Sequence, residues 1–478
     1  MSRSNRRSMF KQIIEHVEIT DVAAEGKSIA RHNDMVIFVN YGAPGDVVDI
    51  QIRKTRKRHM EGEIIRFHSK SDQRVTPFCE HFGTCGGCKW QHLDYNSQIQ
   101  YKQKQVSDSL ERIGKVNYPY QMIPVKGSDN TTFYRNKLEF TFSDKRWLER
   151  SEIEKDQEIH DLNALGFHIP GFFDKVLDIK KCWLQPEPSN RIRLRVKELS
   201  EKHQLPFYDF RKREGFLRNL IIRNNLRGEF MLVLVVKEEN KQWIGLILDD
   251  LKQQFPEVKS LHYIVNAKTN DSISDLQPVH YGGQLFIEEQ MEDLVFETGP
   301  KSFYQTNSEQ AYELYKIMRD FAGLEGSEVV YDLYTGTGTI AAFVSRKAGR
   351  VIGVEYVDEA VSSAVKNAEK NRLNNLTFVH GDMAKVFNES FMNEHGRPDV
   401  VITDPPRAGM HPDVSATLAR SGAQKIVYVS CNPATQARDI ELLSPFYKVM
   451  KVQAVDMFPH TQHVESIVLL EKQKEEAR

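Results

Sequence analysis

Residues 328–355 read EVVYDLYTGTGTIAAFVSRKAGRVIGVE, and this stretch decides the fold. Its two ends, 328–334 and 350–355, are rich in Val, Ile and Tyr, which is typical of buried strands. TIAAFVSRKA between them has the composition and length of a helix. Because two parallel strands need a crossover connection, the stretch predicts a strand, a helix and a second, parallel strand.

The same alternation continues to the end of the chain. DEAVSSAVKNAEKNRL is expected to form a helix, and further strands are expected at 376–380, 399–403 and 425–430. The last two strands, YKVMKVQAVDMF and VESIVLLE, are separated only by PHTQH and must therefore pair as an antiparallel hairpin. An α/β doubly wound parallel sheet ending in such a hairpin is the Rossmann-like arrangement of class I S-adenosylmethionine-dependent methyltransferases.

Two other regions precede this sheet. Residues 10–70 alternate apolar and polar residues between turn signals such as GAPGD, which predicts about four or five short strands in a small OB-like β-barrel. The region that follows mixes a helix-like stretch at 96–113 with strand-like segments at 230–236 and 262–267.

We expect three domains in the chain. They are a barrel at 1–70, a mixed central α+β domain at 71–290 and the methyltransferase-like domain at 291–478.

The composition is that of an ordinary globular protein, with 40% hydrophobic and 27% charged residues. No apolar run approaches the roughly 20 residues that a membrane span needs. The N-terminus, MSRSNRRSMFKQ, is basic and lacks the apolar core of a secretory signal. We therefore expect a cytoplasmic protein without a membrane partner, and no obligate protein partner is evident.

Charge is distributed unevenly, although the formal net charge is only −1. RKTRKRH (53–59) is almost entirely basic, and residues 210–227 interleave arginines with Phe, Leu and Ile. Basic residues mixed with apolar ones suit a surface that neutralises phosphates. The alternative is a solvated charged face balanced by nearby acids.

Acidic residues follow three of the expected strands. In an open parallel sheet, ligands lie beyond the carboxyl ends of the strands, where Glu355, Asp382 and Asp404 are expected. Three carboxylates repel a pyrophosphate and favour a cationic, ribose-bearing ligand such as S-adenosylmethionine. The glycine turn DLYTGTGT (332–339) also lacks the G-x-G-x-x-G pattern of dinucleotide-binding folds. A helix N-cap is the alternative role for each acid.

Cys431 directly follows the fifth strand and is expected at the same edge of the sheet. Asn432 can cap the next helix and Pro433 suits its first turn. A helix N-terminus stabilises a thiolate, so we expect the pKa of Cys431 to be lowered and the residue to act as a nucleophile. A buried structural cysteine is the alternative.

Glu465 begins the last, antiparallel strand and is expected to reach the same edge. A thiolate, a carboxylate and a methyl donor together predict methylation of carbon 5 of a pyrimidine. Thiolate addition at carbon 6 makes carbon 5 nucleophilic, and carbon 5 then takes the methyl group. A base removes the carbon 5 proton, and the thiolate is eliminated.

Four motifs, SCNP, DPPRAG, FPHTQHVE and FYQTN (303–307), resemble those of the RNA (uracil-5-)-methyltransferase family. The resemblance extends over nearly the whole chain and implies Cys431 as nucleophile and Glu465 as proton acceptor. The N-terminal segment resembles the TRAM domain of many members. Departures are Thr335, where many members have Cys, and Thr339, where some have Asn. Cofactor contacts are implied for Gln305, Tyr334, Thr339, Glu355, Asp382 and Asp404.

The other cysteines form a cluster in the sequence. CEHFGTCGGC contains Cys79, Cys85 and Cys88, and Cys182 is the candidate fourth ligand. Tetrahedral zinc is the general interpretation of four thiols, and the spacing of ferredoxins is absent. Members of the family with a similar motif hold a 4Fe-4S cluster, so the resemblance implies an iron-sulfur cluster here, with a structural or RNA-docking role.

The combination of a TRAM domain and a cluster resembles the subgroup that methylates 23S (large-subunit) ribosomal RNA. The T-loop of transfer RNA is the alternative substrate, and a non-catalytic RNA-binding protein is the alternative function. A target uracil must be unstacked or flipped out to be reached. YRNKLEF (134–140) resembles a family motif near the RNA, which makes Arg135 and Lys137 candidate contacts.

Overall fold

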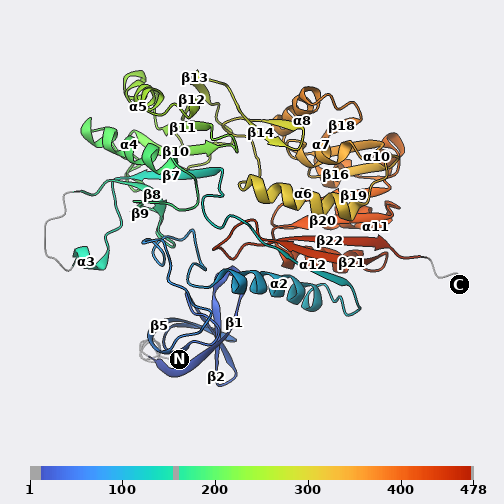
Figure 1. Cartoon of the computed structure of the whole chain (residues 1–478), viewed down its shortest axis with the longest axis horizontal. Helices are drawn as coiled ribbons and strands as arrows, with labels where there is room; N and C mark the ends of the chain where they lie inside the picture. Colours follow the sequence, from blue (N-terminus) through green and yellow to red (C-terminus); the bar gives the residue numbers. More distant parts are fainter. Residues whose placement is uncertain (1–11, 154–160, 475–478) are drawn as a thin grey trace.

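The computed structural model describes residues 12–153 and 161–474. Figure 1 shows a small barrel joined to two larger sheets, one in the middle of the sequence and one at its C-terminal end. Residues 1–11, which contributed to the expected cytoplasmic location, lie outside the described residues. In the described part of the chain, no helix combines the length and the apolar character of a membrane span.

The N-terminal barrel is closed, with the strand order β1-β2-β3-β5-β4. Antiparallel pairing of β1 with β4 completes the closure, and its interior is filled by residues such as Ile19, Ile37 and Ile50. The predicted OB-like barrel is confirmed. Its strands are β1 (Ile13–Val22), β2 (Ser28–His32), β3 (Met35–Val39), β4 (Val47–Thr55) and β5 (His59–Ser69).

The central sheet has seven strands in the order β13-β12-β11-β10-β7-β8-β9. Helices α4 (Ser189–Lys202) and α5 (Lys241–Gln254) pack on it through a shared apolar core. The strand expected at 262–267 begins earlier, since β12 spans Val258–Val265. The other strands are β7 (Lys137–Ser143), β8 (Ala164–His168), β9 (Val176–Asp178), β10 (Leu217–Asn224), β11 (Phe230–Val236) and β13 (Val279–Gly283).

Part of the basic stretch 210–227 is buried, which contradicts its expected role as a phosphate-binding surface. Arg218 and Arg223 lie in β10, a strand buried along its whole length between β7 and β11. Arg218 donates to the carbonyl of Asn266 (2.8 Å) and pairs with Asp271 (2.7 Å). Mixed with Leu and Ile, they belong to a central strand, and their terminal guanidinium nitrogens bond to other parts of the protein. In 53–59, by contrast, Arg53 is exposed and pairs with Glu63.

The C-terminal sheet confirms the predicted methyltransferase fold. Its order is β18-β17-β16-β19-β20-β22-β21-β6, and β22 alone of these runs antiparallel to its neighbours. The strands are β16 (Val329–Leu333), β17 (Arg350–Glu355), β18 (Leu376–His380), β19 (Val400–Thr403), β20 (Lys425–Ser430), β21 (Tyr447–Val455) and β22 (Glu465–Lys472).

Helices cover both faces of this sheet, as expected for a doubly wound fold. One face packs on α6 (Ser308–Ala322) and α7 (Thr339–Ser345). The opposite face packs on α10 (Glu389–His395), α11 (Pro412–Arg420) and α12 (Pro433–Leu443). The remaining elements include the short helices α3 (Arg150–Ile153) and α9 (Met383–Val386), the helix α8 (Asp358–Lys370), and the hairpin of β14 (Ile287–Met291) and β15 (Leu294–Thr298).

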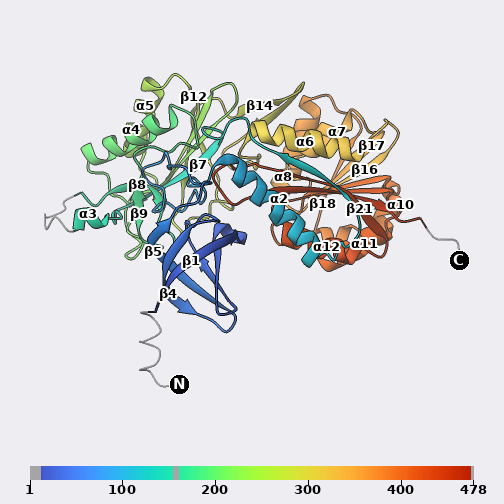
Figure 2. The ribbon, with the colours of Figure 1, turned by 60° about the horizontal axis from the view of Figure 1, so that its bottom comes forward.

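Two elements from the expected central region, 71–290, pack on the C-terminal sheet instead. Helix α2 (Tyr95–Arg112) confirms the predicted helix, and it buries Val106 and Leu110 beside α12 (Figure 2). Strand β6 (Gln121–Lys126) pairs in parallel with β21 at the edge of the sheet. Its sequence, QMIPVK, contains a proline, which an edge strand tolerates but which obscures a strand pattern.

Candidate active site

The antiparallel hairpin brings Cys431 and Glu465 to the same edge of the sheet. Ser430, the last residue of β20, is paired with Ser466 of the adjacent strand β22. Cys431 follows Ser430 and Glu465 precedes Ser466, so these two residues are next to each other in the same register. Asp404 follows β19, the strand on the other side of β20. The charges of Glu465 and Asp404 both act on the Cys431 thiol. The thiol and the carboxylate expected from the sequence therefore lie at the same edge of the sheet, near enough for the charge of Glu465 to raise the pKa of Cys431.

The pKa of Cys431 is raised, whereas the sequence led us to expect a lowered value. Burial is the largest cause and the carboxylates of Glu465 and Asp404 add to it, so the pKa rises to about 11. Arg407 opposes them. Asn432 does cap α12, accepting from the Ala434 amide at 3.2 Å, and Pro433 is in the first turn. The partial charge of a helix end is outweighed by burial and two acids.

The two carboxylates at this edge also bind protons more tightly than usual. Burial raises the pKa of Asp404 to about 7. Burial, and then the charge of Asp404, raise the pKa of Glu465 well above its ordinary range. Like charges held together in a buried place disfavour the ionised forms. A cation placed among these groups would favour their ionised forms, so the site suits a cationic ligand.

The glycine turn after β16 is built around Asp332. The Asp332 carboxylate accepts from the Thr335 hydroxyl at 2.5 Å and from the Ala341 amide at 3.0 Å. Gly338 has a φ of 76°, and a Cβ there would lie 2.9 Å from Ala364 and Phe378. Gly336, also in the left-handed region, has no other group within 4 Å of the corresponding Cβ position. Asp332 therefore fixes the turn, and the space next to Gly336 is open.

Glu355, at the end of β17, holds this turn from its side. Its carboxylate accepts from the Gly336 amide at 3.0 Å and from the amides of Tyr356 and Val357 at 2.9 Å each. Asp382 caps α9 by accepting from the Ala384 amide at 3.1 Å, which is the alternative role considered for it. Both carboxylates remain at the carboxyl ends of their strands, where they were expected.

The other expected cofactor contacts lie around the same turn. Tyr334 is half-buried with a φ of 67°, directly after β16. Thr339 begins α7, and its hydroxyl lies 3.2 Å from that of Tyr315. Gln305 precedes α6, and its carbonyl accepts from the Asn136 amide group at 2.8 Å.

Tyr315 and Arg407 are site residues that the sequence reasoning missed. Burial raises the pKa of Tyr315, and Asp404, Asp332 and Glu465 raise it further, which places the phenol among these acids. Arg407 directly follows DPP and lowers the pKa of Cys431. Its position inside DPPRAG was a usable signal, whereas Tyr315 lies in a helix with no distinctive pattern.

All four remaining cysteines line one cavity of about 180 Å³. Burial raises the pKa of Cys88 to about 12 and that of Cys182 to about 11, and the thiols raise one another further. The backbone of Cys182 is clamped by Asn190, which accepts from its amide (2.8 Å) and donates to its carbonyl (3.0 Å). Four thiols around one cavity form a donor set that suits a metal centre. The other members of the set are Cys79 and Cys85.

The two candidate RNA contacts, Arg135 and Lys137, lie just before β7 and at its first residue. Arg135 lines the cavity, and its guanidinium lies 5.3 Å from the centre of the Phe458 ring. Lys137 begins β7 and is half-buried, and burial lowers its pKa. Arg135 thus touches the segment that leads to Glu465, whereas Lys137 does not form an open basic patch.

Comparison with protein families gives two matches. The tRNA (Uracil-5-)-methyltransferase model matches residues 283–473, and the TRAM domain model matches residues 14–65. The first covers the C-terminal sheet with Cys431 and Glu465, and the second covers the closed barrel.

Relatives and solved structures agree with these matches. An uncharacterized RNA methyltransferase of Bacteroides thetaiotaomicron is 56% identical over 94% of this chain and 100% of its own length. An uncharacterized RNA methyltransferase of Porphyromonas gingivalis is 50% identical over 96% of this chain and 100% of its own length. The Pyrococcus abyssi tRNA (uracil-54, C5)-methyltransferase, solved with S-adenosyl-L-homocysteine, has a TM-score of 0.72 at 28% identity and covers 95% of this chain and 99% of its own.

Relatives this similar over their full length, with both models on the regions expected from the sequence, show the family. The protein belongs to the RNA (uracil-5-)-methyltransferase family and is an RNA methyltransferase.

Proposed function

We propose that the protein transfers a methyl group from S-adenosylmethionine to carbon 5 of a uridine in 23S (large-subunit) ribosomal RNA, giving 5-methyluridine. The observation that carries this proposal is the meeting of Cys431, Glu465 and Asp404 at the carboxyl edge of the sheet. The Pyrococcus abyssi structure, with S-adenosyl-L-homocysteine bound on the same fold, supports the choice of methyl donor.

The methyl donor fits the residues at this edge. S-adenosylmethionine supplies the methyl group on a sulfonium cation. The acids at the edge suit that charge, and the space above Gly336 lets the backbone approach a ligand. The residues that would hold it are Gln305, Tyr334, Thr339, Glu355, Asp382 and Asp404.

Cys431 acts as the nucleophile in this proposal. Its thiol must lose a proton before the sulfur can add to carbon 6 of uracil, and the neighbouring carboxylates oppose that loss. A bound cation beside Asp404 and the side chain of Arg407 both favour the thiolate. The site is therefore most reactive when the donor is already in place, which protects the free thiol from side reactions.

Glu465 acts as the base that completes the reaction. After carbon 5 has taken the methyl group, the Glu465 carboxylate accepts the carbon 5 proton. The electron pair of that C–H bond forms the C5=C6 double bond and expels the Cys431 thiolate. A buried carboxylate with a raised pKa holds the proton well once it has accepted it.

The RNA is bound by several parts of the chain in this proposal. The TRAM barrel and Arg135 provide contacts outside the pocket, and the target base is flipped towards Cys431. The pairing of the barrel with a four-cysteine site supports ribosomal RNA. Transfer RNA is the second candidate, because the solved structure that shares this layout is a tRNA methyltransferase.

A 4Fe-4S cluster is our proposal for the centre held by Cys79, Cys85, Cys88 and Cys182. The four thiols line one cavity, and a cluster held by four cysteine thiolates would fit this donor set.

Incubation with labelled S-adenosylmethionine tests the substrate. We expect label in 5-methyluridine of 23S ribosomal RNA from a strain lacking this gene, and none in transfer RNA from that strain. Digestion to nucleosides followed by chromatography measures both. Label in transfer RNA alone would show that transfer RNA, and not 23S ribosomal RNA, is the substrate. Label in 5-methylcytidine would contradict the assignment of uracil as the target base.

Substitutions at the two reacting residues separate the chemical steps. Cys431→Ala removes the nucleophile, so methylation should fall by at least about 10⁴-fold with no covalent protein–RNA adduct. Glu465→Gln leaves addition intact but removes the base, so an adduct that resists denaturing gel electrophoresis should accumulate. Detectable turnover by Cys431→Ala protein would reject the covalent mechanism.

The dependence of the rate on pH follows from the raised pKa of Cys431. The thiolate fraction increases with pH, so kcat/KM should rise from pH 6 to pH 9. Arg407→Met removes a charge that lowers this pKa, so its profile should shift to higher pH, with a rate at pH 7 about threefold or more below the wild type. Arg407→Lys is the matched control. An unchanged profile in Arg407→Met would show that Arg407 does not support the thiolate.

The metal content of the protein tests the cluster. Protein purified without oxygen should be brown and contain about four irons per chain. Cys182→Ala should lose most of the iron and the visible absorption, whereas Cys431→Ala should keep both. Colourless wild-type protein containing zinc would overturn the cluster.

A further inference from the structure

The turn between β21 and β22, residues 456–464, is held by an internal ion pair. Asp456 is fully buried, and its carboxylate accepts from Lys102 of α2 at 2.5 Å and from the Tyr95 hydroxyl at 2.9 Å. Lys102 is fully buried as well and donates to the Phe458 carbonyl at 3.1 Å. The ion pair therefore fixes the first residues of the turn to a helix about 350 residues away in the sequence.

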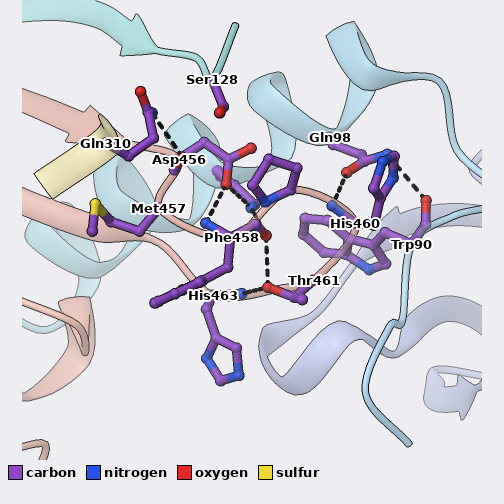
Figure 3. Close-up of polar contacts among 12 residues, drawn as sticks. Trp90, Gln98, Ser128, Gln310, Asp456, Met457, Phe458, His460, Thr461 and His463 are labelled. Atoms are coloured by element: carbon purple, nitrogen blue, oxygen red, sulfur yellow. Dashed lines mark hydrogen bonds and ion pairs between the residues drawn. The ribbon is translucent and has the colours of Figure 1, made fainter. Parts of the chain in front are cut away.

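Gln98, one turn of α2 before Lys102, holds the middle of the same turn. Its side-chain carbonyl accepts from the His460 amide at 2.8 Å. Its amide group donates to the carbonyls of Trp90 (3.1 Å) and Leu93 (2.9 Å). His460 has a φ of 65°, so its backbone depends on these contacts. Gln98 is buried and bridges the turn and the segment around Trp90 (Figure 3).

The cysteine-bearing segment meets the turn at the same point. The amides of Lys89 and Trp90, which directly follow Cys88, both donate to the His460 carbonyl, at 2.9 and 3.0 Å. Tyr134 donates its hydroxyl to the Pro459 carbonyl at 2.9 Å. The segment that carries three of the four cysteines is thus the surface on which the turn rests.

The turn in its place determines where Glu465 lies. Val455, which directly precedes the turn, is the cross-strand partner of Glu465, which directly follows it. Contacts that fix the turn therefore act on a segment joined to Glu465, the proposed base. From the start of α6, the Asn307 side chain donates to the Met457 carbonyl at 3.0 Å and the Gln310 side chain donates to the Asp456 carbonyl at 2.8 Å. Cys431 lies between the end of β20 and the start of α12, outside this set of contacts.

We propose that Gln98 and Lys102 are positioning residues that dock the turn 456–464 on the cysteine-bearing segment and so hold Glu465 for removal of the carbon 5 proton. This inference rests on the proposed function. Because Cys431 is anchored separately, a loosened turn slows proton removal but not thiolate addition. The covalent protein–RNA adduct should then accumulate, which a merely destabilised protein would not do.

A pair of glutamine substitutions on α2 tests this. Gln98→Leu should reduce single-turnover product formation about tenfold or more, with adduct accumulating as in Glu465→Gln and the rate of adduct formation unchanged within about twofold. Gln103→Leu is the matched control, because Gln103 accepts from the Val125 amide of β6 and does not contact the turn. It should behave as the wild type.

Hydrogen exchange gives a readout that is independent of turnover. In Gln98→Leu, amides of residues 456–465 should exchange faster, whereas amides of α12 after Cys431 should not. The double variant Lys102→Met/Asp456→Asn, which leaves no unpaired buried charge, should show the same exchange and the same adduct. Slower product formation in Gln98→Leu without accumulation of the adduct would overturn the positioning role. Equal loss of product formation in Gln98→Leu and Gln103→Leu would overturn it as well. Absence of adduct in Glu465→Gln itself would overturn the proposed chemistry, and the positioning role with it.

Discussion

The reversed direction of β22 is the constraint on which this molecule depends. In a fully parallel sheet, every strand presents its last residue at the edge where ligands bind. Because β22 runs the other way between β20 and β21, it presents its first residue, Glu465, at that edge beside Cys431. One antiparallel strand thereby brings Glu465, the proposed base, next to Cys431, the proposed nucleophile, although the two residues come from opposite ends of their strands.

Electrostatics makes the surroundings of Cys431 a poor place for a thiolate. Burial raises the pKa of Cys431, Asp404 and Glu465; the charge of Asp404 raises that of Glu465 further, and both acids raise that of Cys431 further. The site therefore retains protons until positive charge arrives, and Arg407 supplies only part of it. In the proposed reaction, a cationic methyl donor would lower the free-energy cost of each ionisation that the chemistry needs.

The C-terminal sheet and the position of Cys431 and Glu465 at one edge of it were predictable from the sequence, because strand periodicity and strand ends determine both. The strand pattern from 328 onward and the short PHTQH link were sufficient to place Cys431 and Glu465 on one edge. The pKa of Cys431 was predicted in the wrong direction, because a helix start is visible in the sequence whereas burial and through-space acids are not. The buried Arg218 was misread for a similar reason, since its carbonyl partners are distant in the sequence.

Contacts between residues far apart in the sequence are the part of the structure that the sequence did not predict. No local pattern relates Lys102 to Asp456, and a buried lysine reads in the sequence as an exposed residue of an amphipathic helix. A buried charge pair contributes little to net stability, yet breaking one partner is strongly destabilising, so such a pair selects one arrangement among several. Here it selects the arrangement in which α2 and the cysteine-bearing segment lie against the turn that leads to Glu465. The proposed metal centre would therefore bear on methyl transfer without giving an electron to the substrate, because three of its four cysteines lie in the segment that contacts this turn.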